Sequence, residues 1–400
     1  MEQIHKITLL SDLTPPSLER TWLSAPHPTL PLLATCSADK TVRVYSLTNF
    51  RLLSTISGGH KRSVRSAAWK PNTKENVLAT GSFDATVGIW RNDEQEDEDE
   101  GDGQDRDPEE GWAFSVLLDG HDSEVKSVSW SSSGSLLATC SRDKSIWIWE
   151  DLEDGDNNFE TVAVMQEHGG DVKCVSWHPV EECLASGSYD DTIRLWREDV
   201  DDWGQVACLR GHAGTVWCVD WEGEGGGSTT TTTIPAGGNS SQISAWKEKH
   251  ARSARLVSCS DDRTVRIWRR QPKDHHQQYR PSDVPSIIRP TGLEEHWDEE
   301  AVLPTAHDLS IYTVAWSKAS GRIASVGADG RIVVYEEQFT TSSDDPLQTT
   351  WTVIDSLPGA HGIYEINHVA WAKRADRGKQ ADEEVLITTA DDGSVKVWLV

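Results

Sequence analysis

One pattern of apolar and polar positions, thirteen residues long, recurs seven times along the chain, with an aspartate always at its seventh position. Each copy begins with an apolar run, passes through a turn rich in Ser, Asp and Gly, and continues with alternating apolar and polar residues, which is typical of a β-hairpin. One copy is LATCSRDKSIWIW at 137–149, and the others occupy residues 33–45, 78–90, 184–196, 256–268, 323–335 and 386–398. Self-similarity of this kind predicts an array of equivalent structural units.

A second phrase precedes six of the seven copies: a histidine followed nine or ten residues later by a tryptophan, as in HDSEVKSVSW at 121–130. It predicts a further strand in each unit. Together the two phrases resemble WD40 repeats, in which four antiparallel strands form a blade and the blades surround a central channel. The resemblance implies an all-β, seven-bladed WD40 β-propeller that covers nearly the whole chain.

A single propeller over residues 1–400 is therefore expected. Its blades fall at about 12–56, 60–118, 121–166, 168–210, 212–304, 307–357 and 361–400. The last hairpin lies so close to residue 400 that the seventh blade needs an outer strand from elsewhere. We expect residues 4–10, which include KITLL, to supply it and so to remove two exposed sheet edges.

The resemblance also implies a structural hydrogen bond between each repeat histidine and the aspartate of its own blade. The pairs are His60 with Asp84, His121 with Asp143, His168 with Asp190, His212 with Asp262, His307 with Asp329 and His361 with Asp392. Blade one has Asp39 but no matching histidine. In the same register, most tryptophans, Trp22 included, end strands and are predicted to be core, which leaves at most Trp147, Trp217 and Trp246 for recognition.

Four segments interrupt the repeat spacing and are predicted to be disordered surface inserts, dispensable for folding. They are the acidic run at 93–110, the Gly- and Thr-rich stretch at 223–253, the polar stretch at 269–296, and residues 373–384. Each could serve as an interaction tail, but a solvated insert is the simpler interpretation.

Composition narrows the possible partners. Apolar residues make up 36% of the chain, with no apolar run long enough to cross a bilayer, so a soluble protein without membrane contacts is expected. The N-terminus lacks the features of a secretory signal, which predicts a cytoplasmic protein and leaves nuclear entry open. A formal net charge of −27 disfavours nucleic-acid binding, although the segment 93–110 contributes much of it with twelve acidic residues and one arginine.

Catalysis and metal binding find little support. The seven cysteines include no Cys-x-x-Cys pair, which argues against disulfides, zinc and a resident cluster, and Cys36, Cys140 and Cys259 share one packing position of the repeat. His275 and His276 lie in a polar insert, where a solvated loop is a better interpretation than a metal site. We therefore expect neither an enzyme nor a cofactor or metal.

Partner-binding residues can be located on the top face, where WD40 propellers commonly bind partners. The candidates precede each turn aspartate or flank the start of each first strand, and they are Arg65, Phe83, Lys126, Arg142, Lys173, Tyr189, Trp217, Asp261, Tyr312 and Asn367. Cationic and aromatic side chains in one region fit an acidic or aromatic peptide. The alternative is that any one of them is an ordinary exposed loop residue.

The phrases CSRDKSIWIWE at 140–150, MQEHGGDVKCVSWHP at 165–179 and LASGSYDDTIRLW at 184–196 resemble the WD40 subunit of the cytosolic iron–sulfur protein assembly machinery, in a fungal form with long inserts. The resemblance implies a non-catalytic scaffold with Arg142 as its leading functional residue. The partners that it implies are a hydrogenase-like iron–sulfur carrier, a small targeting protein, a HEAT-repeat adaptor and apo iron–sulfur client proteins. A WD40 scaffold of another complex, such as a histone-tail reader or a ubiquitin-ligase substrate receptor, is the alternative.

Overall fold

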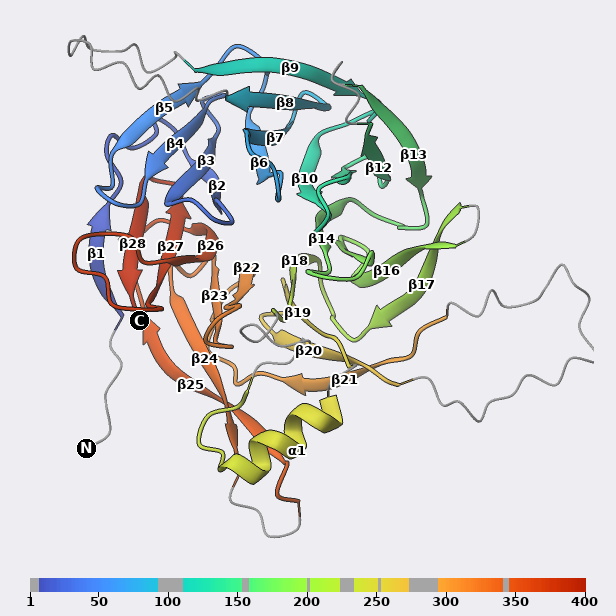
Figure 1. The fold of residues 1–400 in the computed structure, drawn as a ribbon, viewed down its shortest axis with the longest axis vertical. Coiled ribbons are helices and arrows are strands. Elements are labelled where there is room, and N and C mark those ends of the chain that lie inside the picture. Colours follow the sequence, from blue (N-terminus) through green and yellow to red (C-terminus); the bar gives the residue numbers. More distant parts are fainter. Residues whose placement is uncertain are drawn as a thin grey trace, which may run out of the picture.

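The computed structural model describes residues 7–92, 111–152, 158–199, 202–223, 234–250, 253–272, 294–340 and 345–400. Their strands form seven four-stranded antiparallel sheets arranged as blades around a central axis (Figure 1). In six blades the strands follow one another in sequence from the axis outward, as in β6-β7-β8-β9. The predicted seven-bladed propeller is confirmed.

The strand bounds repeat closely from blade to blade. Blades one to four consist of β2 (Thr21–Pro26), β3 (Leu32–Ser37), β4 (Val42–Ser46) and β5 (Leu52–Ile56); β6 (Val64–Trp69), β7 (Asn76–Ser82), β8 (Thr86–Asn92) and β9 (Trp112–Asp119); β10 (Val125–Trp130), β11 (Leu136–Ser141), β12 (Ile146–Asp151) and β13 (Phe159–Met165); and β14 (Val172–Trp177), β15 (Leu184–Ser188), β16 (Thr192–Asp199) and β17 (Asp202–Arg210). Blades five to seven consist of β18 (Val216–Trp221), β19 (Arg255–Ser260), β20 (Val265–Arg270) and β21 (Trp297–Val302); β22 (Ile311–Trp316), β23 (Ile323–Gly327), β24 (Ile332–Phe339) and β25 (Thr349–Leu357); and β26 (Ile366–Lys373), β27 (Glu384–Ala390), β28 (Val395–Leu399) and β1 (Thr8–Asp12).

The N-terminal strand closes the ring as expected. β1 pairs antiparallel with β28, with Thr8 opposite Leu399 and Asp12 opposite Lys396. The strand begins and ends later than the predicted range 4–10, of which residues 4–6 lie outside the described part of the chain. This pairing gives the last blade its fourth strand and covers an edge that would otherwise be open to other chains.

The core lies between neighbouring blades and is fastened by the tryptophans that end the first strands. The indole Nε1 of Trp69 donates to the carbonyl oxygen of Ala25 at 2.8 Å, and Trp221 donates to that of Ser176 at 2.9 Å. Each bond joins one blade to the blade before it. A buried indole N–H needs such an acceptor, so the repeated tryptophan supplies both apolar area and a fixed link between sheets.

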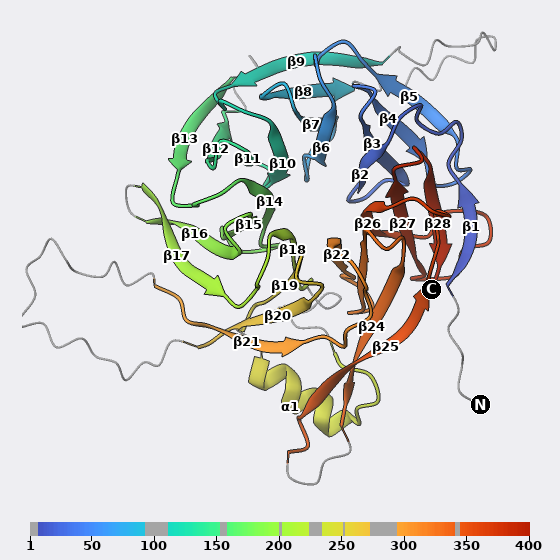
Figure 2. The same ribbon diagram turned by 180° about the vertical axis from the view of Figure 1, so that it is seen from behind.

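The insert at 223–253 differs from the prediction that it is disordered. Its described part contains α1 (Ser240–His250), which lies outside the ring at the seam of blades five and six (Figures 1 and 2). Trp246 of α1 is only 2% exposed and is therefore not available for recognition. The physical reason lies beneath the helix, where the fully buried Arg255 binds Glu222 at 2.7 Å and Glu337 at 2.8 Å. Trp246 covers this guanidinium at 5.8 Å, and charges that are shielded from water in this way are held in good geometry.

Of the other three inserts, the structure describes one in full, one in part and one not at all. Residues 93–110 and most of 269–296 lie outside the described ranges. Residues 373–384 form a compact turn between β26 and β27, contrary to the expectation of disorder. Arg374 Nη1 binds Glu383 at 2.9 Å, and the backbone amide of Arg374 bonds to the carbonyl of Glu383 at 2.8 Å. The ion pair and the backbone bond together explain why this polar segment is ordered.

Candidate partner-binding face

A β-bulge recurs at the start of every first strand and creates the top rim of the channel. In blade two, Val64 is opposite Ser82 but Ser66 is opposite Gly81, so Arg65 is the extra residue. An extra residue leaves the ladder, and its side chain is redirected. The bulged residues of blades one to seven are Trp22, Arg65, Lys126, Lys173, Trp217, Tyr312 and Asn367. The same β-bulge therefore presents one side chain from each blade at the mouth of the channel.

The histidine–aspartate pairs hold the turns that surround this rim. In blade three, His121 Nδ1 lies 2.9 Å from Asp143 Oδ2, while its Nε2 lies 2.9 Å from Thr139 Oγ1. Burial raises the pKa of Asp143, but hydrogen bonds from His121 and Ser145 outweigh it and hold that pKa well below its usual range. The corresponding distances are 2.9 Å for His168–Asp190, 2.8 Å for His212–Asp262, 3.0 Å for His307–Asp329, and 3.4 Å for both His60–Asp84 and His361–Asp392. The ionised carboxylate ties the turn to the strand beneath it.

Blade one, which has no repeat histidine, uses other donors. Ser17 Oγ donates to Asp39 Oδ2 at 2.9 Å, and Arg43 Nη1 donates to the same oxygen at 2.8 Å. Asp39 therefore keeps the role of the other turn aspartates, and the turn has the same support.

The lysines of blades three and four lie against aromatic rings at the rim. Lys126 Nζ is 4.3 Å from the ring centre of Phe83. Lys173 Nζ lies between Tyr189 and Trp217, at 5.4 and 5.0 Å from their ring centres. Such cation–π contacts hold the ammonium groups in place, and Lys173 Nζ also binds Asp171 Oδ2 at 3.2 Å. Tyr189 is itself 62% exposed, so this cluster is open to solvent.

The two lysines also share a concentrated positive field with Arg65. Burial lowers the pKa of Lys126 to about 8, and the positive charges of Lys173 and Arg65 act in the same direction. An anionic group bound between them would relieve this repulsion. The region therefore favours a carboxylate ligand on electrostatic grounds.

Arg142 stands on the outer side of the same cluster and is 59% exposed along its side chain. Its Nη1 lies 3.4 Å from Glu124 Oε2, and Arg62 Nη1 reaches Glu124 Oε1 at the same distance. Two guanidinium groups thus share one carboxylate through long contacts, and Arg62 Nη1 also donates to the carbonyl oxygen of Phe83 at 2.6 Å. Arg142 is suited to bidentate binding of a further carboxylate.

The opposite side of the rim is acidic. Trp217 Nε1 donates to Asp261 Oδ1 at 2.6 Å, and the Tyr312 hydroxyl donates to Glu365 Oε2 at 3.0 Å. Asp261 and Tyr312, both among the sequence candidates, therefore belong to a rim segment of the opposite charge from Lys126. The structure brings the candidates into one ring, but that ring has two chemically different halves.

Asn367 requires a correction, because it is only 7% exposed and cannot contact a partner directly. Its Nδ2 donates to the carbonyl oxygen of Thr21 at 3.0 Å and to Asp391 Oδ1 at 2.9 Å. These bonds join blade seven to blade one where the ring closes. Asn367 occupies the predicted register, but it serves as a link between blades.

The sequence predicts that Trp22 is a core residue at the end of a strand, but the structure places it in the rim. It is the bulged residue of β2, with the guanidinium carbons of Arg20 and Arg65 at 4.9 and 5.2 Å from its ring centre. Its Nε1 is buried and has no hydrogen-bond partner within the described residues. The missed signal is that no histidine stands nine or ten residues before Trp22, whereas each of the other six blades has one before its strand-end tryptophan.

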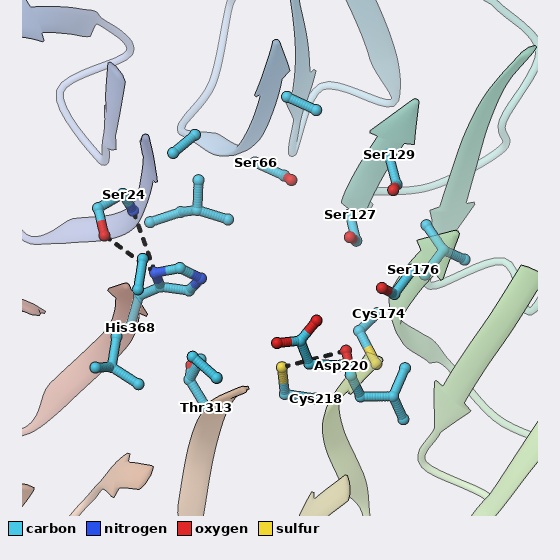
Figure 3. A pocket seen from close by; sticks show the side chains of 18 of the residues that line it. Ser24, Ser66, Ser127, Ser129, Cys174, Ser176, Cys218, Asp220, Thr313 and His368 are labelled. Carbon is cyan, nitrogen blue, oxygen red and sulfur yellow. Dashed lines mark hydrogen bonds between the residues drawn. The ribbon is translucent and has the colours of Figure 1, made fainter. Parts of the chain in front are cut away.

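Below the rim, the channel forms a cavity of about 470 Å³ lined by apolar side chains together with several serines. Figure 3 shows Ser66, Ser127 and Ser176 around it, with His368 bonded to Ser24 on the opposite wall.

Burial raises the pKa of the Cys218 thiol to about 12, so this thiol stays protonated and is a poor metal ligand. Among the described residues, no group of three or more His, Cys, Asp or Glu side chains is arranged to hold a metal ion. No helix in those ranges is long and apolar enough to cross a bilayer.

Comparison with known proteins identifies the repeats. The model for the WD domain, G-beta repeat, matches residues 21–46, 50–91, 113–150, 159–197, 229–269 and 299–336. Proteins named probable cytosolic iron-sulfur protein assembly protein 1 are 65% identical in Aspergillus flavus, 63% in Penicillium rubens and 67% in Aspergillus terreus. Each comparison covers 98% of this chain and 97 to 98% of the relative. The chain therefore belongs to the WD40-repeat family of cytosolic iron-sulfur protein assembly protein 1.

Proposed function

We propose that this protein is a non-catalytic scaffold of cytosolic iron–sulfur protein assembly, and that it docks an acidic or aromatic partner segment on the top face of blades two to four. The observation that carries the docking site is the convergence of Lys126, Lys173 and Arg142 beside Phe83 and Tyr189 on a chain of net charge −27. A cationic patch on an otherwise acidic protein directs acidic partners to one place.

The geometry supports recognition by pre-formed groups. The ammonium groups of Lys126 and Lys173 are already oriented by aromatic rings, so little side-chain entropy is lost when a ligand binds. Phe83 and Tyr189 offer flat apolar surfaces beside these charges. An aromatic side chain flanked by carboxylates fits both features.

The scaffold acts by proximity. In a propeller the blades form a ring that leaves only short sheet edges, and this rigid ring can hold several partners at fixed positions. The partners that we propose are a hydrogenase-like iron–sulfur carrier, a small targeting protein, a HEAT-repeat adaptor and the apo client proteins. Holding carrier and client together raises their effective concentration, while the cluster chemistry stays with them. The names of the relatives place this assembly in the cytosol, and we propose the same compartment here.

The test is affinity purification of the tagged protein from its own cells, comparing wild type with Arg142→Glu. The matched control is Arg51→Glu, which makes the same charge change at an exposed residue between β4 and β5. We expect wild type and Arg51→Glu to recover iron–sulfur assembly factors that Arg142→Glu loses. Recovery of chromatin or ubiquitin-ligase subunits instead would contradict the assignment, and equal recovery by all three proteins would contradict the site.

A further inference from the structure

Four large apolar side chains stand exposed on the top face of blades six, seven and one. Ile363 is 95% exposed and Leu18 is 90% exposed, and Leu309 and Tyr364 are also open to solvent. We call these four residues the apolar ridge. All lie in the loops that lead from an outer strand to the first strand of the next blade. The corresponding loops of blades two to five, where described, carry no exposed large hydrophobic residue.

The loops that carry the ridge pack against two turns of the framework. Leu309 follows His307, which is bound to Asp329 at 3.0 Å, and the carbonyl oxygen of Tyr364 lies over the same turn. A Cβ atom on Gly330 would come within 2.9 Å of that oxygen, and Gly330 has a φ of +63°, so only glycine permits the contact. Leu309 and Tyr364 are thereby held on either side of one turn.

The same arrangement recurs at the next turn. The carbonyl oxygens of Ser17 and Glu19, on either side of Leu18, would lie 2.6 and 2.8 Å from a Cβ atom on Gly393. His361, two residues before Ile363, binds Asp392 in that turn at 3.4 Å. The ridge therefore runs from blade six over blade seven to blade one on loops fixed to the framework.

Ile363 has no role in folding that the structure reveals. The loop that carries it is one residue longer than its equivalents, since ten residues separate His361 from Trp371 and nine separate His307 from Trp316. Gly362 has a φ of +67°, and the turn that it makes projects Ile363 outward. A single exposed apolar side chain is ordinary, but four on adjoining loops mark an interaction surface.

Acidic side chains border the ridge. Asp308, Glu365 and Glu19 are exposed beside it. The nearby cations are already engaged, since Arg331 lies 3.6 Å from Asp308 and Arg20 lies 3.2 Å from Asp391. We infer that the apolar ridge is a second docking surface, which binds a partner protein through a segment of aliphatic residues flanked by lysine or arginine. A second copy of this chain fits poorly, because two bodies of charge −27 repel each other.

This inference goes beyond the proposed function and uses the other half of the top face, so either can fail alone. The test is selection of displayed random peptides on the full-length wild-type protein, with counter-selection against the double variant Leu309→Asp, Ile363→Asp. We expect the surviving peptides to combine aliphatic residues with Lys or Arg and to bind the double variant at least about tenfold more weakly. Glu365→Lys should weaken the same peptides, and an acidic aromatic peptide should still bind all of these proteins.

The matched control is Leu117→Asp, an equivalent change at an exposed position of the outer strand β9. It should leave binding of the selected peptides unchanged. Thermal unfolding of each variant shows whether it folds like wild type, as the exposure of the substituted residues predicts. The inference is overturned if no peptide discriminates wild type from the double variant, or if the discriminating peptides are acidic. It is also overturned if sedimentation shows a wild-type dimer that the double variant loses, because the occupant would then be a second copy.

Discussion

The two halves of the top face share one backbone and differ in chemistry. In blades two to four the bulged residues are Arg65, Lys126 and Lys173, whereas Trp217 and Tyr312 in blades five and six donate hydrogen bonds to carboxylates. The bulge is present in every blade because the same strand pairing repeats. Since a bulged side chain leaves the ladder, its identity scarcely affects pairing. The repeat can therefore keep its architecture while each half acquires its own binding chemistry.

Removing a turn aspartate should have the largest effect on stability, and it should do so in both halves of the top face. Asp190→Ala in blade four and Asp392→Ala in blade seven remove the carboxylate that faces His168 or His361. Each change leaves buried donors without acceptors, so we expect a loss of about 2 kcal/mol in the free energy of unfolding. Denaturant unfolding measures it, with the exposed Asp122→Ala as the control expected to change little. A large loss for Asp190→Ala alone would mean that the two halves rest on different supports.

Reversing charge in one half should alter binding in that half alone. Lys126→Glu is expected to weaken an acidic aromatic peptide at least about tenfold, because it places a carboxylate beside Glu124 and against the ligand. Glu365→Lys, in the other half, should leave this affinity unchanged within about twofold. Fluorescence anisotropy with a labelled peptide measures both. Equal weakening by the two variants would show that the face acts through its total charge.

A change of pH should sharpen the same comparison. Burial lowers the pKa of Lys126 to about 8, so this group is charged at about pH 7 and mostly neutral at about pH 9. We expect the acidic peptide to bind several-fold more weakly at the higher pH, as positive charge is lost. Arg65, Lys173, Glu124 and Asp171 are the charged groups that act on Lys126. Lys126→Arg, which stays charged, should remove the dependence, and a dependence that persists would assign it to another group.

The smallest effect is expected at Trp22. Its indole Nε1 is buried without a partner, so Trp22→Phe removes an unsatisfied donor together with some packing. We expect the free energy of unfolding to change by less than about 1 kcal/mol. Trp177→Phe should cost more, because the Nε1 of Trp177 donates to the carbonyl of Ser129 at 3.0 Å. A large loss at Trp22 would show that this position is structural, as its first assignment to the core implied.

The sequence predicted which positions lie on the candidate face, but it did not predict the contacts that each side chain makes there. The position that flanks the start of each first strand located Arg65, Lys126, Lys173, Trp217, Tyr312 and Asn367, and all six lie at the bulge of their blades. It missed Trp22, because blade one lacks the histidine that marks the start of the first strand. It also could not show that Asn367 turns inward to join blades seven and one, since that contact links residues 346 positions apart. Separations of this size carry no local signal.

The inserts also show a feature that the sequence did not predict, because its cause lies in distant residues. Residues 234–250 read as a polar stretch of low complexity, yet α1 is ordered because Trp246 covers the buried ion pairs of Arg255. The weak apolar character of the helix gives no reason for it to form alone. The ion-pair partners of Arg255 are Glu222 and Glu337, and these two carboxylates come together only when blades five and six pack.

The sequence by itself determined the number of blades and their strands, because both follow from a periodic pattern repeated seven times. The outer strand that the seventh blade lacks predicted the ring closure, and particular phrases within the pattern indicated the family. Tertiary structure alone decided the charge division of the top face, the apolar ridge, the inward role of Asn367 and the packing of α1. These features depend on which loops and side chains of different blades meet across the ring. Periodicity specifies a unit and its copies, whereas the chemistry of a binding face arises where non-equivalent positions of those copies come into contact.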